Sequence, residues 1–227
     1  MQKMNQHELE EKRNEQREHV LDYAFNEFIQ KGLKAVKMND IAFALSMSKR
    51  TLYEMFEDKE GLLIECMKLN HKRGREEFEK LRKESSNSLE TFTKFYRKQL
   101  QDLRRVNPAF LSDIQKYEKV MAYLEESSRE KNEFALRFTQ ECVENGLFRN
   151  DVNFELALST FDIVARAMLS NEFYMQYGFE NIIHTINLTF VRGLCTLKGL
   201  EIIDSEDYFL KMKEDVANSQ AVENSND

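Results

Sequence analysis

The stretch from Met38 to Leu63, MNDIAFALSMSKRTLYEMFEDKEGLL, decides the fold of this chain. Apolar side chains between Met38 and Leu45 recur at intervals of three and four residues, which predicts a helix with one buried face. Ser46 and Ser48 follow, and small polar residues of this kind favour a tight turn. The pattern therefore predicts a short helix that ends in a turn.

A second short helix is expected from about Lys49, with Leu52 and Phe56 facing inward. Its outward positions carry Lys49, Arg50, Thr51 and Tyr53. Asp58 is placed to cap a third helix that starts near Lys59. Two short helices joined by a turn, with donors on the outer face of the second, form a helix-turn-helix whose second helix fits the major groove of DNA.

From about Val20 to Leu63 the chain resembles the DNA-binding domain of TetR-type transcriptional regulators. The resemblance is carried by Gly32, Asp40-Ile41-Ala42, Ser48-Lys49, Thr51-Leu52-Tyr53, Phe56, Lys59 and Leu62-Leu63. It implies an all-α fold with an N-terminal three-helix helix-turn-helix DNA-binding domain and a C-terminal helical bundle for ligand binding and dimerisation. The first helix, from about Arg17 to Lys31 and ended by Gly32, would brace the other two.

The composition favours an all-helical, cytoplasmic protein. The chain has 227 residues with one proline and seven glycines. No apolar run approaches the length of a membrane span, and the N-terminal segment lacks the apolar core of a secretory signal. Cys66, Cys142 and Cys195 lie far apart without metal-ligand spacing, so we expect buried apolar residues rather than metal ligands or redox sensors.

The net charge of −7 is unevenly distributed. Residues 1–75 carry 14 basic and 13 acidic side chains, whereas the remainder carries 19 and 27. DNA binding depends on the local field of the docking face rather than on the total charge. The charge pattern therefore permits DNA binding by the N-terminal part without demanding it.

We expect four segments: an arm (1–16), a helix-turn-helix domain (17–64), a helical effector-binding and dimerisation domain (65–210) and a polar tail (211–227). Within the long domain we expect helices at about 89–106, 108–126, 127–145, 154–169 and 180–197. Gly146 and Gly199 would follow the ends of two of them. The arm would be a frayed helical extension or disordered, and the tail disordered.

Two positions depart from the family pattern. Ser46 stands where glycine is frequent, and a left-handed backbone there costs another residue about 1–2 kcal/mol, so we expect a slightly reshaped turn. Lys37 stands where a hydroxyl often caps the second helix; an ammonium cannot accept a hydrogen bond from the first N–H groups. Lys37 can contact phosphate instead.

The expected DNA contacts are Lys37, Ser48, Lys49, Arg50, Thr51, Tyr53 and Lys59. Arg50 is suited to a bidentate contact with O6 and N7 of guanine. Ser48 or Thr51 can bond phosphate, and Tyr53 can bond phosphate or lie against a thymine methyl group. The resemblance gives Lys59, at a helix N-terminus, a phosphate-clamping role. The alternative, a solvated surface, is weakened by the arrangement and by the resemblance.

Two predicted helices of the C-terminal part are apolar around most of their circumference, so each must be buried on two sides. One side can pack within the subunit and the other against a twofold mate, or both can lie in one large core. The expected dimer residues are Leu156, Thr160, Ile163, Val164, Ala167, Ile183, Ile186, Phe190 and Leu194.

Aromatic residues and a methionine suggest a pocket for an apolar or aromatic ligand, although such stripes are more often plain core. The candidates are Phe92, Phe95, Tyr96, Phe110, Tyr117, Met121, Phe138 and Phe161, with Arg166 or His184 as a polar anchor.

The sequence thus predicts a DNA-binding regulator rather than an enzyme. As a homodimer it would repress from a partly palindromic operator until a small ligand releases it. An alternative is an interaction module that binds a protein partner through its C-terminal domain and uses DNA as an anchor. No nucleophile elbow, glycine-rich phosphate loop or metal-binding motif is present, so we expect no catalytic residues, cofactor or metal.

Overall fold

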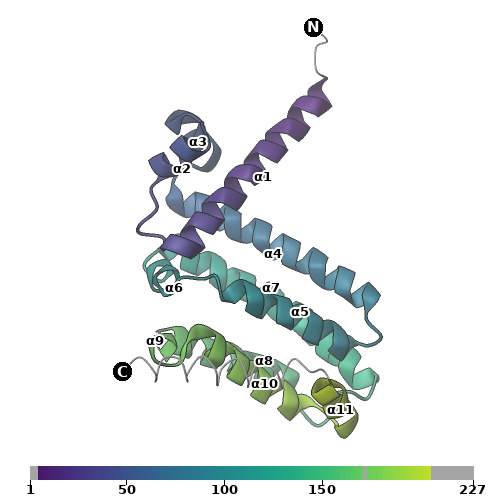
Figure 1. The fold of residues 1–227 in the computed structure, drawn as a ribbon. Helices are drawn as coiled ribbons and strands as arrows, with labels where there is room; N and C mark the ends of the chain where they lie inside the picture. Colours follow the sequence, from purple (N-terminus) through teal and green to yellow (C-terminus); the bar gives the residue numbers. More distant parts are fainter. Residues whose placement is uncertain (1–4, 171–172, 206–227) are drawn as a thin grey trace. The chain divides into compact units, whose positions relative to one another are not determined.

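The computed structural model describes residues 5–170 and 173–205, and regular structure in these ranges is helical (Figure 1). This confirms the predicted all-α fold. The helices in chain order are α1 (Gln6–Lys31), α2 (Met38–Ala44), α3 (Lys49–Phe56), α4 (Lys59–Glu84), α5 (Ser88–Leu103), α6 (Pro108–Ile114), α7 (Glu118–Glu144), α8 (Phe154–Ser170), α9 (Phe173–Tyr177), α10 (Phe179–Leu194) and α11 (Leu197–Ser205).

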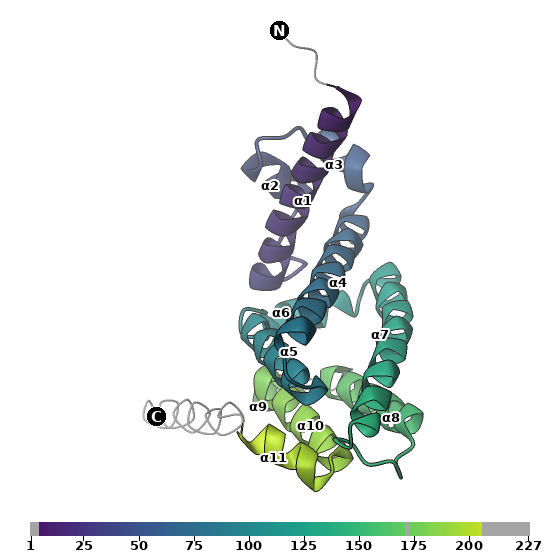
Figure 2. The same ribbon diagram turned by 90° about the vertical axis from the view of Figure 1, so that its right-hand side faces the viewer.

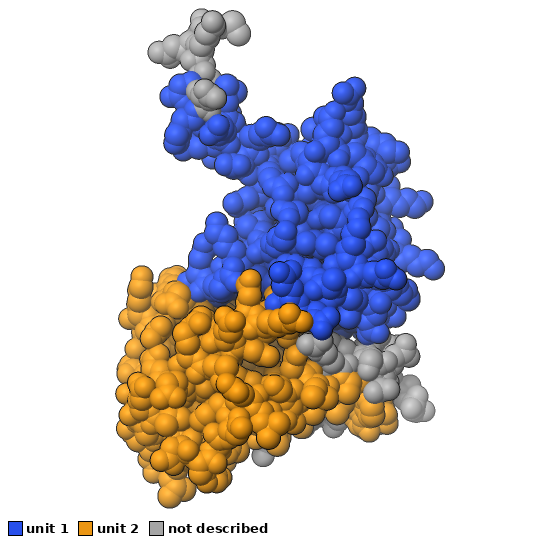
Figure 3. Space-filling model, turned by 180° about the vertical axis from the view of Figure 1, so that it is seen from behind, with its two compact units in different colours: residues 1–76, 105–126 blue, residues 77–104, 127–227 orange. Residues whose placement is uncertain are grey.

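The chain forms two compact units (Figure 3). Unit 1 consists of residues 1–76 and 105–126, and unit 2 of residues 77–104 and 127–227. This division differs from the predicted boundary at residue 64. The difference arises because α6 and the start of α7 pack on the N-terminal helices, a long-range contact that no local pattern announces.

In unit 1, α2 and α3 lie beside α1 (Figures 1 and 2). Their shared core is built from the apolar stripe of α1 and the inward faces of α2, α3 and α4. Its buried residues include Val20, Ala24, Phe28, Ile41, Leu52, Phe56, Leu62 and Leu63. These are the positions that the three-and-four spacing selects, so the hydrophobic pattern is sufficient to place the helix-turn-helix.

Helix α1 begins well before the predicted start at Arg17. Asn5 caps it through a reciprocal pair: Glu8 N donates to Asn5 Oδ1 at 2.8 Å, and Asn5 N donates to Glu8 Oε2 at 2.9 Å. The first turns of the helix are exposed. A capping box can thus start a helix where no apolar stripe marks it. At the other end Gly32 adopts φ 85°, as its predicted place after the helix suggests.

The break between α6 and α7 lies at residues 115–117, not at the predicted position between residues 126 and 127. Lys116 N and Tyr117 N bond back to Asp113 O and Ile114 O, which ends α6 in a turn. The serine pair that suggested the later break lies inside α7. Ser127 is buried, and Ser128 Oγ donates to Asp162 of α8 at 3.1 Å. Tertiary contacts therefore override the helix-breaking tendency of serine.

Helix α10 ends at Leu194, before the predicted end at Leu197. The turn after α7 pairs with the end of α10 and the residues that follow it: Arg149 N donates to Leu194 O at 2.9 Å, and Thr196 N donates to Leu147 O at 3.0 Å. Gly199 does not end a helix but lies within α11, where an added Cβ would lie 2.2 Å from Leu147 O. A close backbone approach, rather than a helix terminus, requires this glycine.

The core of unit 2 joins α5, α7, α10 and α11. Its buried residues are Leu89, Tyr96, Leu100, Cys142, Leu147, Phe148, Cys195 and Ile203. Burial raises the pKa of the Cys142 thiol to about 12 and that of Cys195 to about 11. The buried thiols in this unit thus fit a packing role.

Among the described residues, no helix has both the length and the apolar character needed to cross a membrane. The same residues contain no group of His, Cys, Asp and Glu side chains that could hold a metal ion. The predicted tail, 211–227, lies outside the described residues.

Candidate functional site

Helix α3 starts with a side-chain cap. Ser48 Oγ accepts a hydrogen bond from Thr51 N at 3.0 Å and lies 2.8 Å from Thr51 Oγ1. Such a cap satisfies one of the N–H groups that a helix leaves open. The two hydroxyls are thus bonded to each other at the start of α3, and the phosphate contact expected of one of them remains a prediction.

The outward face of α3 presents its cations to solvent. The Arg50 side chain is 87% exposed and its Nε lies 2.7 Å from Glu54 Oε1. Lys49 Nζ lies 5.5 Å from the centroid of the Tyr53 ring, and Tyr53 is 39% exposed. An exposed pair such as that of Arg50 is worth at most about 1 kcal/mol. The side chain can therefore leave Glu54 for a base edge at little cost.

The inward face of α3 is fixed by Leu52 and Phe56, which are both buried. The Arg17 guanidinium lies over the Phe56 ring, 4.6 Å from its centroid, and bonds to Glu65 of α4. Arg17 thus ties the end of α3 to α1 and α4. No local sequence pattern predicts this role, because Arg17 precedes the apolar stripe of its own helix.

The turn before α3 keeps a left-handed backbone despite its serine, so it is not reshaped as expected. Ser46 has φ 52°. Its N–H bonds to Phe43 O at 3.1 Å, and Met47 N bonds to Ala42 O at 2.9 Å. These bonds hold the conformation against a cost of about 1–2 kcal/mol for a residue other than glycine.

Two exposed side chains lie at α2, one at its N-cap and one on its outer face. Lys37 occupies the N-cap position, is exposed, and forms no side-chain cap, as its chemistry predicts. Phe43 is 88% exposed, although a large aromatic side chain usually finds a partner surface. The sequence reasoning missed Phe43, whose only signal is that it lies off the buried stripe of its helix.

Lys59 lies at the start of α4, but its ammonium group is engaged within unit 1. Nζ donates to Leu33 O at 2.8 Å and to Val36 O at 3.1 Å. Partial burial lowers the pKa of Lys59, against the opposing effect of Asp113. In this structure the side chain fastens the segment between α1 and α2 to α4, so a phosphate contact through Nζ would require it to leave both carbonyls.

Asp58 caps α4, as predicted. Its Oδ1 accepts a hydrogen bond from Gly61 N at 2.7 Å, and Oδ2 accepts one from Lys119 of α7 at 3.1 Å. The hydrogen bond from Gly61 and the Lys119 ammonium lower the pKa of Asp58, although burial acts in the opposite direction.

Helix α6 is bonded to the end of α1. Asn107 N donates to Ile29 O at 2.6 Å, and its Nδ2 donates to Gln30 O at 3.0 Å. Lys34 N donates to Asp113 Oδ2 at 2.8 Å. Residues that the sequence assigned to the effector domain thus hold the C-terminal end of α1 and the segment that leads to α2.

The predicted ligand residues do not share one environment. Phe110 packs edge-on against Phe25 of α1, with ring centroids 6.4 Å apart, and belongs with Tyr117 and Met121 to unit 1. In unit 2, Phe161 packs against Phe190, with centroids 5.4 Å apart. The side chain of Arg166 lies outside the described part of the chain.

Four other candidates pack in unit 2. Phe92 and Tyr96 stack with centroids 5.8 Å apart, Phe95 packs on Phe78 with centroids 5.3 Å apart, and His184 is half-buried on α10. They are not among the residues that line two open hollows of unit 2. Most of the aromatic stripe is thus core, because periodicity shows which side chains face inward but not what they face.

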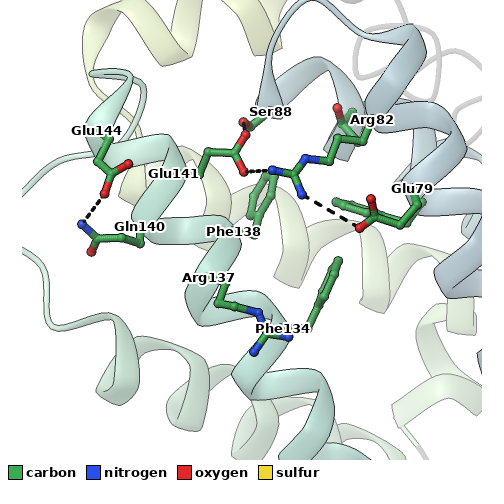
Figure 4. A pocket seen from close by; sticks show the side chains of 11 residues that line it. Glu79, Arg82, Ser88, Phe134, Arg137, Phe138, Gln140, Glu141 and Glu144 are labelled. Carbon is green, nitrogen blue, oxygen red and sulfur yellow. Dashed lines mark hydrogen bonds and ion pairs between the residues drawn. The ribbon is translucent and has the colours of Figure 1, made fainter.

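One open hollow in unit 2 is lined by a predicted candidate, Phe138. Its volume is about 620 Å³, and its walls come from the end of α4, the start of α5 and α7 (Figure 4). Sequence reasoning missed its charged lining, notably Arg82, Arg137 and Glu141. When each helix is considered alone, the charged residues of α4 and α7 are typical of a solvent-exposed surface.

The expected dimer residues separate into an exposed and a packed group. On α8, Leu156 is 65% and Ile163 67% exposed, and Thr160 and Ala167 are also exposed. On α10, Ile186 is buried in its own subunit. It packs in a cluster with Ile182, Phe161, Val164, Met168 and Phe190. Ile186 is thus covered within its own chain, whereas α8 retains an apolar outer face.

These features define a class: an all-α protein with an N-terminal helix-turn-helix whose second helix presents cations outward. Residues 20–66 match the sequence model of the bacterial regulatory proteins of the tetR family. They therefore form a TetR-type DNA-binding domain.

Solved structures share the fold of most of the chain. A TetR-family transcriptional regulator from Agrobacterium tumefaciens has 13% identity and a TM-score of 0.62 over 81% of this chain and 99% of its own. The regulatory protein TetR from Rhodobacter sphaeroides has 15% identity and a TM-score of 0.61 over 78% and 98%. A ketosteroid transcriptional regulator of Mycobacterium tuberculosis has 17% identity and a TM-score of 0.51 over 79% and 95%.

At these identities the structures establish the fold, and the matched residues establish the domain. No curated protein matched the chain. The TetR-type domain and the shared all-α fold together support a DNA-binding transcriptional regulator.

Proposed function

We propose that this protein is a transcriptional repressor that binds a partly palindromic operator as a homodimer and leaves it when a small ligand binds. The observation that carries the proposal is the outer face of α3 in a TetR-type domain. Lys49, Arg50 and Tyr53 lie exposed on a helix whose other face is fixed in the core. A recognition helix needs this combination of rigid placement and accessible donors.

The exposed stripe of α8 supports a homodimer. Leu156, Thr160, Ile163 and Ala167 follow one another at four- and three-residue intervals along one helix face. Exposed apolar faces of this kind mark interaction sites. In a twofold dimer, such a face contacts the same face of a second copy of the chain. A dimer also gives two recognition helices, which matches an operator with two half-sites.

Control by a ligand would act through the segments that pass between the units. The chain passes between the units within α4, between α5 and α6, and within α7. Helix α6 is bonded to the end of α1 through Asn107, and to Lys34 in the segment that leads to α2 through Asp113. We therefore assign to α4, α6 and α7 together the task of conveying a ligand-linked population shift to the DNA-binding domain.

Selection of bound sequences from random duplex DNA, at a stated salt concentration, tests the proposal. We expect enrichment of an inverted repeat whose half-site separation reflects successive turns of the duplex. Binding that depends on salt alone, without an enriched sequence, would contradict the operator-binding role and favour an interaction module that uses DNA as an anchor.

A further inference from the structure

The open hollow of unit 2 has the size of a small-molecule site. Its volume of about 620 Å³ falls within the range of about 300–1,000 Å³ that is common for ligand pockets. Helix α4 contributes residues from its last turns, α5 from its first turn, and α7 from its C-terminal half (Figure 4). All of these residues belong to unit 2.

Three phenylalanines form the apolar part of the hollow. Phe78 is buried, and its ring packs edge-on against Phe134, with centroids 4.9 Å apart, and against Phe138, with centroids 6.1 Å apart. Edge-to-face packing fixes each ring against the next. The hollow therefore offers a rigid aromatic surface to a ligand.

Each carboxylate in the lining is already paired or hydrogen-bonded. Glu141 accepts hydrogen bonds from Arg82 Nη2 and from Ser88 Oγ, each at 2.7 Å. Gln140 Nε2 donates to Glu144 Oε1 at 3.1 Å, and Glu79 Oε1 lies 3.9 Å from Arg82 Nη1.

Arg137 differs from these groups. It is exposed and lines the hollow, yet within the described part of the chain it has no hydrogen-bond or ion-pair partner. In Figure 4 it extends from the same helix as Phe134 and Phe138, and no dashed line reaches it. Among the described residues, the charged group of the hollow that makes neither a hydrogen bond nor an ion pair is thus a cation beside an aromatic surface.

We propose that this hollow binds an amphipathic organic anion, with its carboxylate on the Arg137 guanidinium and its apolar body on Phe78, Phe134 and Phe138. The planar guanidinium can hold a carboxylate through two parallel hydrogen bonds. This inference rests on the proposed function, because it specifies the chemical class of the releasing ligand. Arg137 takes the anchoring role that was predicted for Arg166 or His184.

A ligand of the opposite charge fits less well. An amphipathic cation would have to share carboxylates that already accept hydrogen bonds from Arg82, Ser88 or Gln140. An anion meets the Arg137 guanidinium, which makes no such bond within the described part of the chain. The unbonded guanidinium is therefore the observation that favours an anionic ligand.

Titration of three fluorescent probes into the purified full-length chain, without DNA, tests this proposal. Pyrenebutanoate, pyrenebutanol and pyrenebutylamine share one ring system and differ in the charge of the head group. We expect the butanoate to bind at least about tenfold more tightly than the alcohol, a difference of about 1.4 kcal/mol, and the amine to bind most weakly.

Variants locate the contact. Arg137→Gln should remove the advantage of the butanoate and leave the alcohol unchanged, whereas Arg137→Glu should reverse the preference toward the amine. Phe134→Ala should weaken all three probes. Arg129→Gln, which removes an exposed arginine from the same helix outside the hollow, serves as the matched control. Circular dichroism melting verifies that each variant folds.

Three outcomes would overturn the inference: no probe binds, the amine binds the wild type best, or Arg137→Gln leaves butanoate binding unchanged. The proposed function fails separately, because operator binding is measured in the absence of any probe. If the probes show the expected head-group selectivity but no operator is found, the anion site is supported and the repressor function is not. If an operator is found but the probes show no selectivity, the repressor function is supported and an amphipathic anion is excluded as the ligand of this hollow.

Discussion

Arg50 has an exposed guanidinium on α3, and its bond to Glu54 within the described chain is a surface pair. Such pairs contribute little to stability, because solvent and salt screen them. Removing either partner should therefore leave the fold intact. This separation of binding from folding makes α3 a suitable place for substitutions.

We expect Arg50→Ala and Tyr53→Ala each to weaken operator binding strongly while leaving the dimer mass and helicity unchanged. Loss of a bidentate base contact costs about 1–3 kcal/mol at each half-site. Fluorescence anisotropy with a labelled operator measures the loss, and Arg129→Ala is the control. Undiminished binding by both variants would contradict the assignment of α3 as the recognition helix.

Lys59 and Lys37 are predicted to differ in their response to salt. Lys59→Met removes the donor for Leu33 O and Val36 O, which should lower the free energy of unfolding by about 1–3 kcal/mol. Because Nζ is engaged within the domain, the slope of log K against log salt should stay unchanged. Lys37→Ala, at an exposed position, should reduce that slope by about 0.9 for each half-site.

Urea unfolding and operator titrations over a range of salt concentrations provide the two measurements. If Lys59→Met reduced the slope as Lys37→Ala does, Lys59 would be a phosphate contact in the complex. Unchanged stability of Lys59→Met would in turn show that its two hydrogen bonds are dispensable.

At the scale of the element, the cap of α4 makes stability depend on pH. Asp58 has a lowered pKa, chiefly through the hydrogen bond from Gly61 N. Its contribution is therefore complete above the unfolded pKa of about 3.9 and is lost as the pH falls through the folded pKa. Asp58→Ala should lower the free energy of unfolding by about 1 kcal/mol at pH 7.

This difference should shrink as the pH falls below the unfolded pKa of about 3.9 and through the lower folded pKa. Asp58→Asn, which keeps an oxygen acceptor for Gly61 N, should lose less than the alanine variant at pH 7. Urea unfolding at pH 7 and at a series of acidic pH values measures these effects. A difference between wild type and Asp58→Ala that grows in acid would contradict the assigned role of the carboxylate.

Two glycines within helices should respond in opposite ways to alanine. In Gly199→Ala the new Cβ would lie 2.2 Å from Leu147 O, so the segment must shift, and we expect destabilisation of about 1–3 kcal/mol. Gly74, inside α4, has nothing within 4 Å of an added Cβ. Gly74→Ala should therefore stabilise the chain by up to about 1 kcal/mol. Equal effects in thermal unfolding would contradict the close approach at Gly199.

The elements that local chemistry controls could be predicted from the sequence. The spacing of the apolar residues and the helix caps were enough to predict α2, α3 and the start of α4. Leu52, Phe56 and Asp58 each act within a few residues of their own helix. The break at 115–117 and the helix around Gly199 could not be predicted, because they depend on contacts with α1 and with the turn at Leu147. The hollow could not be predicted either, because Arg137 and Phe78 lie on different helices and meet only through tertiary contacts.

At the scale of the whole molecule, the outer face of α8 should control assembly. Ile163→Glu places a charge in the exposed apolar stripe, so we expect the mass in sedimentation velocity to fall from two chains to one. Operator binding should fall with it, because a monomer reaches a single half-site. Gln101→Glu, at an exposed residue of α5, adds the same charge as a control. A dimer that survives Ile163→Glu would place the interface elsewhere.

In the proposed mechanism α3 reads base pairs in the major groove, with Arg50 on guanine. Sequence selection by the wild type and by Arg50→Ala, both at reduced salt so that the variant still binds, tests this base contact. We predict an inverted repeat in both experiments, with the guanine preference lost at one position of each half-site in the variant alone. An identical motif from both proteins would contradict the claim, because Arg50 would then contribute no base recognition.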